Sequence, residues 1–325
     1  MGIPRRQFLH LAAGAAAWLA APRVVRAEAY PLRPVRIIVG YTPGGSTDIV
    51  ARVIGQQLQE QLGQPFIIEN RPGAGASIGT EAVVRSPADG HTLLLVNSAD
   101  TINATLYPRL NFNFMRDIAP IASLARQPQA VLATPSLPAR TLPELIAFAK
   151  ANPGKVTMAS PGNGTIGHLS GEMLKLMTGI DLLHVPYRGA APALTDLIAG
   201  HVQILFTGLT GSIEYSKTGK IRALAVTTST RADALPDVPA VGEFVPGYEA
   251  VSLFGVGAPR NTPANITNTL NREINAALAR PGIAARVAEL GGTVLAGSPA
   301  EFADILARET DKWGKVIRAA SITAG

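Results

Sequence analysis

The sequence predicts an α/β fold made of two lobes. Short apolar strands alternate with helical patterns from residue 35 onward, in two blocks that no Gly/Ser-rich linker separates. Such alternation is typical of sheets that carry helices on both faces. A chain of 325 residues, 47% of them hydrophobic, also fits two domains better than one. We therefore expect mostly parallel sheets in two interleaved lobes.

The first block contains three strands and two helices. Apolar segments predict strands at residues 35–41, 65–70 and 91–97. Apolar residues recur at helical spacing over residues 49–62, which predicts a helix there. A second, shorter helix is expected over residues 80–85.

The second block repeats this order, and the chain then returns to further elements. Strands are expected at residues 131–136, 156–160, 182–186, 202–207 and 221–227. Helices are expected between them, at residues 142–151, 168–178 and 190–199. The final elements are strands at 254–259 and 293–295 and helices at 263–278 and 299–320.

This order indicates that the chain passes between the lobes twice. We place the crossings around residues 124–129 and 251–257. One lobe then consists of residues 30–127 and 255–325, and the other of residues 128–254. Ligands of open α/β sheets bind outside the carboxyl ends of the strands, so we expect a ligand cleft between the lobes.

The first residues have the pattern of an export signal. The twin arginines Arg5 and Arg6 precede an apolar run, and small residues then offer cleavage sites near Ala27 or Ala29. This order is typical of a secretory signal of the twin-arginine type. The apolar run is too short to span a bilayer. We expect residues 1–27 to be removed and the mature protein to reside in the periplasm.

The composition excludes several classes of function. Removal of the signal takes away four arginines, so the formal net charge falls from +6 to +2 and no basic patch remains for nucleic acid. The absence of cysteine excludes disulfides, thiolate nucleophiles and cysteine metal sites. The histidines of the mature chain are not closely spaced, so we expect neither a metal nor a cofactor.

Two stretches of the chain share one design, a buried strand followed by a glycine-rich turn and a helix. The first turn is TPGGSTD at residues 42–48, and the second is PGNGTIG at residues 161–167. Such a junction points free backbone N–H groups and the positive end of a helix dipole at one place. Two junctions in one chain predict an anion that is held from two sides.

Two catalytic alternatives use other features of the glycine-rich segments. Gly162, Gly164 and Gly167 satisfy the dinucleotide fingerprint G-x-G-x-x-G, although an exported protein meets little nicotinamide cofactor. Ser77 lies in a G-x-S-x-G pattern like the elbow of α/β hydrolases, but residues 70–73 separate it from the preceding strand. An exported hydrolase or a dinucleotide-binding enzyme therefore remains the alternative function at this point.

Several segments of the chain match one family. They are YTPGGSTDIVAR, ENRPGAGASIGTEAVVRSPADGHTLLL, VPYRGAAPALTDLIAGHV, and KIRALAVT with the following DVPAVGE. The chain resembles the periplasmic solute-binding proteins of tripartite tricarboxylate transporters, often called Bug proteins. The resemblance implies the two-lobed fold of type II periplasmic binding proteins, with a ligand cleft and no catalysis. It also implies a di- or tricarboxylate or an aromatic acid as ligand and a membrane permease as partner, and we expect a monomer.

The resemblance further implies which residues bind the ligand, with one carboxylate held between the two glycine-rich turns. The first lobe would contribute Thr42, Gly44, Gly45, Ser46, Asp48 and Ser98, and the second Ser160, Gly164, Thr165, His168, Arg188 and Thr207.

Three of these residues have a second interpretation, and a fourth departs from the family pattern. Asp48 would repel a bound carboxylate, so we expect it to cap the helix or to hold the loop. His168 can instead satisfy backbone groups at the start of its helix, and Arg188 can be a solvated residue rather than a partner for a distal carboxylate. Members of the family often carry an acidic residue in the place of Thr207, so threonine here favours a neutral or hydroxylated ligand end over an amino acid.

Overall fold

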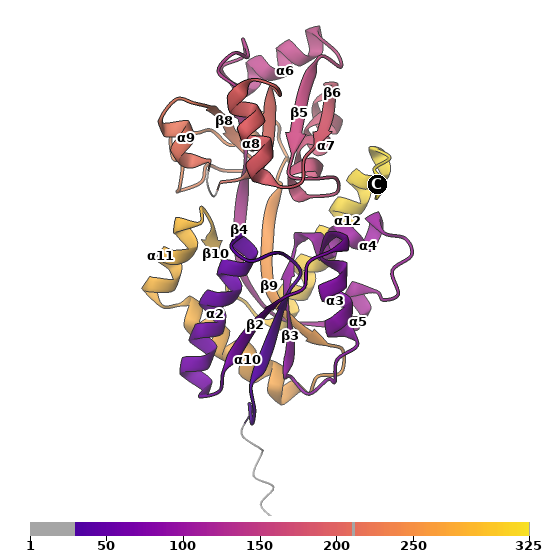
Figure 1. Ribbon diagram of the computed structural model, residues 1–325, viewed down its shortest axis with the longest axis vertical. Helices are drawn as coiled ribbons and strands as arrows, with labels where there is room; N and C mark the ends of the chain where they lie inside the picture. The colour runs from indigo at the N-terminus through magenta and orange to yellow at the C-terminus, as the bar shows by residue number, and fades with distance from the viewer. Residues whose placement is uncertain (1–29, 210–211, 325) are drawn as a thin grey trace, which may run out of the picture.

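The computed structural model describes residues 30–209 and 212–324, apart from the side chains of Ile213 and Lys217. The expected export signal, with its cleavage site near Ala27 or Ala29, lies outside these residues. The described chain forms two α/β lobes stacked along the long axis of the molecule (Figure 1). Two long strands, β4 (Ile118–Ala133) and β9 (Val251–Pro259), join the lobes.

The lower lobe of Figure 1 is built on the strand order β2-β1-β3-β9-β4. Its other strands are β1 (Val35–Val39), β2 (Phe66–Asn70), β3 (Thr92–Asn97) and β10 (Thr293–Val294), which pairs with β4. Its helices are α2 (Ser46–Leu62), α3 (Ser77–Val84), α4 (Ser98–Leu106), α5 (Phe114–Asp117), α10 (Ala264–Leu278) and α11 (Pro281–Glu289). A short 3₁₀ helix, η1 (Ala74–Ala76), precedes α3.

The upper lobe continues from the second half of β4 in the strand order β4-β7-β5-β6, with β8 also paired to β4. The added strands are β5 (Val156–Ser160), β6 (Leu182–Pro186), β7 (Ile204–Gly208) and β8 (Arg222–Val226). The helices are α6 (Leu142–Ala151), α7 (Ile166–Thr178), α8 (Ala190–Ala199), α9 (Ile213–Lys217) and the 3₁₀ helix η2 (Val241–Glu243).

The sheets are mixed, and the expectation of mostly parallel sheets is wrong in this respect. Strand β1 is parallel to β2 and β3, and β5 is parallel to β6 and β7. Every pairing that involves β4 or β9 is antiparallel. These antiparallel pairings arise because the chain runs into the upper lobe along β4 and back into the lower lobe along β9, so the two strands have opposite directions.

The pairing of β4 changes from one lobe to the other within two residues. Pro128 is the last residue of β4 that pairs with β9, opposite Val251, and Gln129 is the first that pairs with β7. The first expected crossing lies at this change of partner. The residues from Val251 to Phe254, assigned to the upper lobe from the sequence, pair in the lower sheet.

The last helix, α12 (Pro299–Ala319), contacts both lobes. Phe302 and Leu306 near its start pack into a core of the lower lobe. Trp313 and Ile317 near its end join the main core of the upper lobe. Beyond the helix, the Asn163 side chain donates a hydrogen bond to the carbonyl oxygen of Thr323 (2.7 Å). The end of the segment assigned to the lower lobe therefore bridges the two lobes.

Four α-helices (α4, α5, α9 and α11), the two 3₁₀ helices and residues 118–130 of β4 were not expected from the sequence. The clearest case is α4, whose sequence SADTINATL has few apolar residues. It forms because Asn97 and Asp100 close a capping box at its start and because it packs against α12. Both causes depend on neighbours that a single-sequence pattern does not show.

Trp313 provides a test of the contact between α12 and the upper lobe. Its side chain is fully buried, and its Nε1–H donates to Glu309 (2.8 Å). We expect Trp313→Ala to lower the free energy of unfolding by about 3–5 kcal/mol, as for other buried large-to-small changes. Urea denaturation followed by circular dichroism measures the loss. Phe244→Ala, at an aromatic side chain that is 44% exposed, is the matched control and should cost much less. Equal losses in the two variants would contradict this packing role.

Candidate ligand-binding cleft

A cavity of about 250 Å³ lies where the two lobes meet the crossing strands. The lower lobe contributes Tyr41, Ser46, Thr47, Asn97, Ser98 and Ala99. The upper lobe contributes Pro161, Thr165, Ile166, Gly167 and Gly208. The floor is formed by residues of β4 and β9, namely Gln127, Gln129, Ser252, Leu253 and Phe254. Among the residues that the structure describes, those lining the cavity all have uncharged side chains.

Three helices begin at this cavity. Ser46 starts α2, Ser98 starts α4 and Ile166 starts α7, and all three residues line the cavity. The first N–H groups of a helix have no partner within the helix, and the helix dipole adds positive potential at that end. The cavity can therefore attract an anion through backbone groups, without a cationic side chain in its lining.

The first glycine-rich turn is held in shape by Asp48. The Asp48 carboxylate is buried and accepts hydrogen bonds from Gly44 N (3.0 Å), Arg52 Nε (2.9 Å) and Asn70 Nδ2 (2.9 Å). Burial raises the pKa of Asp48, but the hydrogen bonds from Arg52, Gly44 and Asn70 outweigh it and lower the pKa below its ordinary value. Asp48 thus points away from the cavity and folds the loop, whereas Ser46 lines the cavity.

Three more predicted residues of this turn lie beside the cavity rather than in its lining. Thr42, Gly44 and Gly45 are exposed and do not line it. Gly44 has a φ of 91°, a conformation that glycine adopts without strain.

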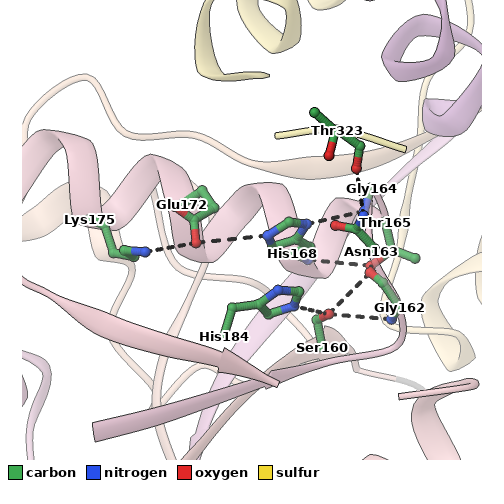
Figure 2. Close-up of polar contacts among 10 residues, drawn as sticks. All are labelled: Ser160, Gly162, Asn163, Gly164, Thr165, His168, Glu172, Lys175, His184 and Thr323. Carbon is green, nitrogen blue, oxygen red and sulfur yellow. Dashed lines mark hydrogen bonds and ion pairs between the residues drawn. The ribbon is translucent and has the colours of Figure 1, made fainter. Parts of the chain in front are cut away.

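The second glycine-rich turn is capped at the start of α7 by Thr165. The Thr165 hydroxyl accepts a hydrogen bond from His168 N (3.4 Å) and donates one to Gly162 O (2.7 Å). His168 completes the turn, because its Nδ1 accepts a hydrogen bond from Gly164 N (3.1 Å) (Figure 2). Thr165 lines the cavity, while the buried ring of His168 supports the turn from behind.

A second histidine stacks on the first. The rings of His168 and His184 are nearly parallel, with centroids 3.7 Å apart (Figure 2). His184 Nε2 lies 2.7 Å from Ser160 Oγ, which also bonds to Gly162 O (3.1 Å). Burial, helped by His184 and Lys175, lowers the pKa of His168 to about 3. Burial, helped by the positive charge of Lys175, lowers the pKa of His184 to about 4. Ser160 and both histidines are therefore neutral supports of the turn and do not line the cavity.

Two glycines of the turn are required by close packing. A Cβ atom on Gly164 would lie 2.2 Å from Leu106 Cδ2 of α4, and one on Gly167 would lie 2.4 Å from Phe206 O of β7. Contact with the neighbouring elements thus accounts for two of the three glycines in the dinucleotide fingerprint. No phosphate is needed to explain them.

The start of α4 is fixed by its own polar groups. Ser98 Oγ accepts a hydrogen bond from Leu253 N (2.8 Å), so this lining residue ties α4 to β9. Asp100 Oδ2 accepts a hydrogen bond from Asn97 N (2.9 Å). Burial raises the pKa of Asp100 to about 6, against the hydrogen bonds from Thr80 and Asn97. The positive end of α4 therefore already carries an acidic side chain.

The remaining predicted residues are placed differently. Thr207 is buried in β7, and its neighbour Gly208 lines the cavity instead. Arg188 is exposed and does not line the cavity. Ser77, the candidate hydrolase nucleophile, is buried at the start of α3, and its Oγ accepts a hydrogen bond from Asn103 Nδ2 (3.1 Å). Strand β2 ends well before it, so the strand-to-helix elbow of a hydrolase is missing at Ser77.

The floor of the cavity was not predicted. The floor residues Gln127, Gln129 and Ser252 lie within the two expected crossings. Their position at the crossings is the one sequence feature that could have identified them as cleft residues. Within the described residues, no group of three or more histidine or acidic side chains could hold a metal ion.

A sequence model of the tripartite tricarboxylate transporter family receptor matches residues 50–322. The chain belongs to this family.

The receptor is similar to three solved proteins. A protein of R. palustris solved with adipate is 36% identical, with a TM-score of 0.82, over 90% of this chain and 99% of its own. The periplasmic binding protein BugD is 32% identical, with a TM-score of 0.78, over 90% and 99%. MatC of Rhodopseudomonas palustris, solved with bound malate, is 30% identical, with a TM-score of 0.77, over 89% and 100%.

These comparisons confirm the expected family and the two-lobed α/β fold. The receptor is a periplasmic solute-binding protein, and its family binds substrates rather than converting them. The expectation of a protein without catalysis is confirmed, and the hydrolase and dinucleotide alternatives are set aside. In the described part of the chain, no helix is both long and apolar enough to cross a membrane.

The stacked histidines predict a pH dependence of stability. Both folded pKa values, about 3 and about 4, lie below the ordinary value of 6.5, so the unfolded chain binds more protons in between. The free energy of unfolding should therefore fall as the pH drops below 6.5 and stop responding to these groups above it. For the buried His168 alone the slope reaches up to about 1.4 kcal/mol per pH unit.

The double variant His168→Asn, His184→Gln keeps an acceptor at each position and removes this titration. We expect a flatter fall of the unfolding free energy between pH 6.5 and pH 5 than in the unmodified protein, measured by urea denaturation. Gln59→Ala, at an exposed position of α2 that carries no titratable group, is the control and should leave the slope unchanged. An unaltered slope in the double variant would show that the stacked pair does not resist protonation.

Proposed function

We propose that this receptor captures a small organic carboxylate between its lobes and delivers it to the membrane permease of a tripartite transporter. One observation carries the proposal. Three helix N-termini meet at one cavity whose described lining contains no charged side chain. Such a site suits a small anion, because backbone N–H groups at the helix starts can donate hydrogen bonds to it in fixed directions. A flexible Lys or Arg side chain is not needed.

The start of α7 is the best candidate for the carboxylate position. The first turns of α2 and α4 contain Asp48 and Asp100, whereas the first turn of α7 contains no acidic residue. The positive potential of α7 is therefore the least compensated of the three. Thr165 and Gly167 would face the carboxylate from the upper lobe, and Ser46 from the lower lobe.

The magnitudes are sufficient for useful affinity. A hydrogen bond to a charged group contributes about 1.5–3 kcal/mol net. Four such bonds, less the cost of ordering the ligand and the loops, correspond to micromolar binding at roughly 8 kcal/mol. The ligands named for two relatives, adipate and malate, are both carboxylates, which supports the proposed class.

The predicted residues take two roles in this proposal. Ser46, Ser98 and Thr165 line the cavity and lie near the ligand. Asp48, Ser160, Gly164 and His168 hold the two turns. Thr42, Gly44 and Gly45 would approach the ligand on closure, and we assign Arg188 and Thr207 no direct contact in the present arrangement.

Several finer features belong to the same proposal. Residues 1–27 would act as a twin-arginine export signal, cleaved near Ala27 or Ala29. The lobes would close about β4 and β9, since these strands form the connection between the sheets. The receptor would act as a monomer and present its closed form to the permease.

Thermal unfolding with a panel of mono-, di- and tricarboxylates and aromatic acids tests the proposed class. We expect at least one carboxylate to raise the midpoint, by an amount that grows with ligand concentration, because ligand binds only the folded state. Matched neutral amides that lack every carboxylate should give no shift. Stabilisation by the neutral amides alone would contradict the proposal.

Thr165→Ala tests the role of the α7 terminus. Loss of this N-cap costs about 0.5–2 kcal/mol and loosens the first turn. We expect affinity for every carboxylate ligand to fall alike, by about two- to thirtyfold, measured by isothermal titration calorimetry. Thr195→Ala, at an exposed threonine of α8, is the control. Unchanged affinity in Thr165→Ala would mean that the carboxylate lies elsewhere.

A further inference from the structure

The floor of the cavity contains two glutamines at matching positions. Gln127 and Gln129 are two residues apart on β4, so their side chains leave the same face of the strand. Gln127 is paired with Ser252 of β9, and Gln129 with Gly208 of β7. The two amides therefore lie side by side where the sheets of the two lobes meet.

Both amides are held in place. Gln127 Nε2 donates a hydrogen bond to the carbonyl oxygen of Leu290, and Gln129 Nε2 donates one to Ser252 Oγ (3.0 Å). The backbone N–H of Gln129 donates to Thr227 Oγ1 (2.8 Å). Both glutamines are nearly fully buried yet line the cavity. Fixed amides of this kind can distinguish hydrogen-bonding groups by position.

Gly208 leaves room for a ligand above these amides. A Cβ atom at this position would lie 3.6 Å from Gln127 Oε1 and 3.9 Å from Gln129 Nε2. Any larger side chain would extend over the two amides. The absence of a side chain at Gly208 therefore keeps this part of the floor open to the cavity.

The surroundings of the floor do not suit a charged group. No described residue of the lining carries a charge that could neutralise an ammonium group or a second carboxylate. At the nearby start of α4, Asp100 accepts hydrogen bonds from Asn97 N and Thr80 Oγ1. A second carboxylate there would be repelled by the like charge of Asp100. Asp100 does not line the cavity, and its oxygens already accept these two hydrogen bonds, so an ammonium group at the floor would contact amides and no carboxylate.

We infer that Gln127 and Gln129 form a neutral subsite that reads the far end of the ligand. The preferred ligand is a monocarboxylate whose other end is an uncharged hydrogen-bonding group, such as a carboxamide, carbonyl or hydroxyl. Leu253 and Phe254 of β9 belong to the same floor. This inference rests on the proposed function, since it takes the carboxylate to lie at the glycine-rich turns.

A matched ligand series tests the subsite. At each of three chain lengths, calorimetry at pH 7.5 compares a dicarboxylate (succinate, glutarate or adipate) with its monoamide, its ω-hydroxy analogue and its ω-amino analogue. We expect the monoamide or hydroxy acid to bind at least about tenfold more tightly than the dicarboxylate and the amino acid of equal length, because a buried unpaired charge costs more than one hydrogen bond gains.

The outcomes separate this inference from the proposed function. Equal or tighter binding of the dicarboxylates would overturn the neutral subsite and leave carboxylate capture standing. Binding of none of these acids, nor of any in the wider carboxylate panel, would overturn both. Preference for the neutral-ended acids at any length that binds supports the subsite.

Gln129→Glu locates the selectivity at this residue. The added carboxylate should favour the ω-amino acid over the monoamide, reversing their order by at least about tenfold, because it supplies the missing counter-charge. Gln59→Glu makes the same change at an exposed position of α2 and should leave the order unchanged. An identical order in Gln129→Glu and the unmodified receptor would assign the selectivity to another residue and overturn the role of Gln129.

Discussion

The antiparallel ladder between β4 and β9 is the constraint on which both lobes and the cleft depend. It extends from the pair Ile118–Pro259 to the pair Pro128–Val251, and β4 then continues into the upper sheet. One strand thus belongs to two sheets, and the cavity floor lies where it changes partner. The backbone groups of β4 are paired on both sides of this point, so strand pairing fixes the floor, and one glycine-rich turn lies in each lobe.

The two glycine-rich turns are held in shape by different kinds of side chain. In the lower lobe a buried carboxylate, Asp48, gathers the turn, and Arg52 balances its charge. In the upper lobe the neutral ring of His168 does so, with His184 stacked behind it. The upper support brings no charge to the start of α7, so the potential of that helix remains available to an anion. The two supports thus differ in charge, and this difference underlies the proposal that the carboxylate lies at the start of α7.

The glycine-rich turns could be predicted from the sequence, because strand, glycines and helix lie within one short segment. The roles inside each turn could not, since the hydrogen bond between Gly164 N and His168 Nδ1 makes His168 a support only once the turn is folded. The floor of the cavity is even harder to predict from the sequence. Gln129 and Ser252 are 123 residues apart and become partners only through the pairing of β4 with its neighbours. The short helix α4 was missed for a similar reason, because its capping and its contact with α12 are tertiary.

The bridging position of the C-terminal segment has a practical consequence. Asn163, in the second glycine-rich turn, is hydrogen-bonded to Thr323, and Ile322 and Ala324 rest on the core of the upper lobe. Residues 322–324 therefore contact the upper lobe directly at the second glycine-rich turn and at its core. For a biosensor, a reporter fused here would lie beside the second glycine-rich turn, whereas an affinity tag placed here without a spacer would press on the same turn.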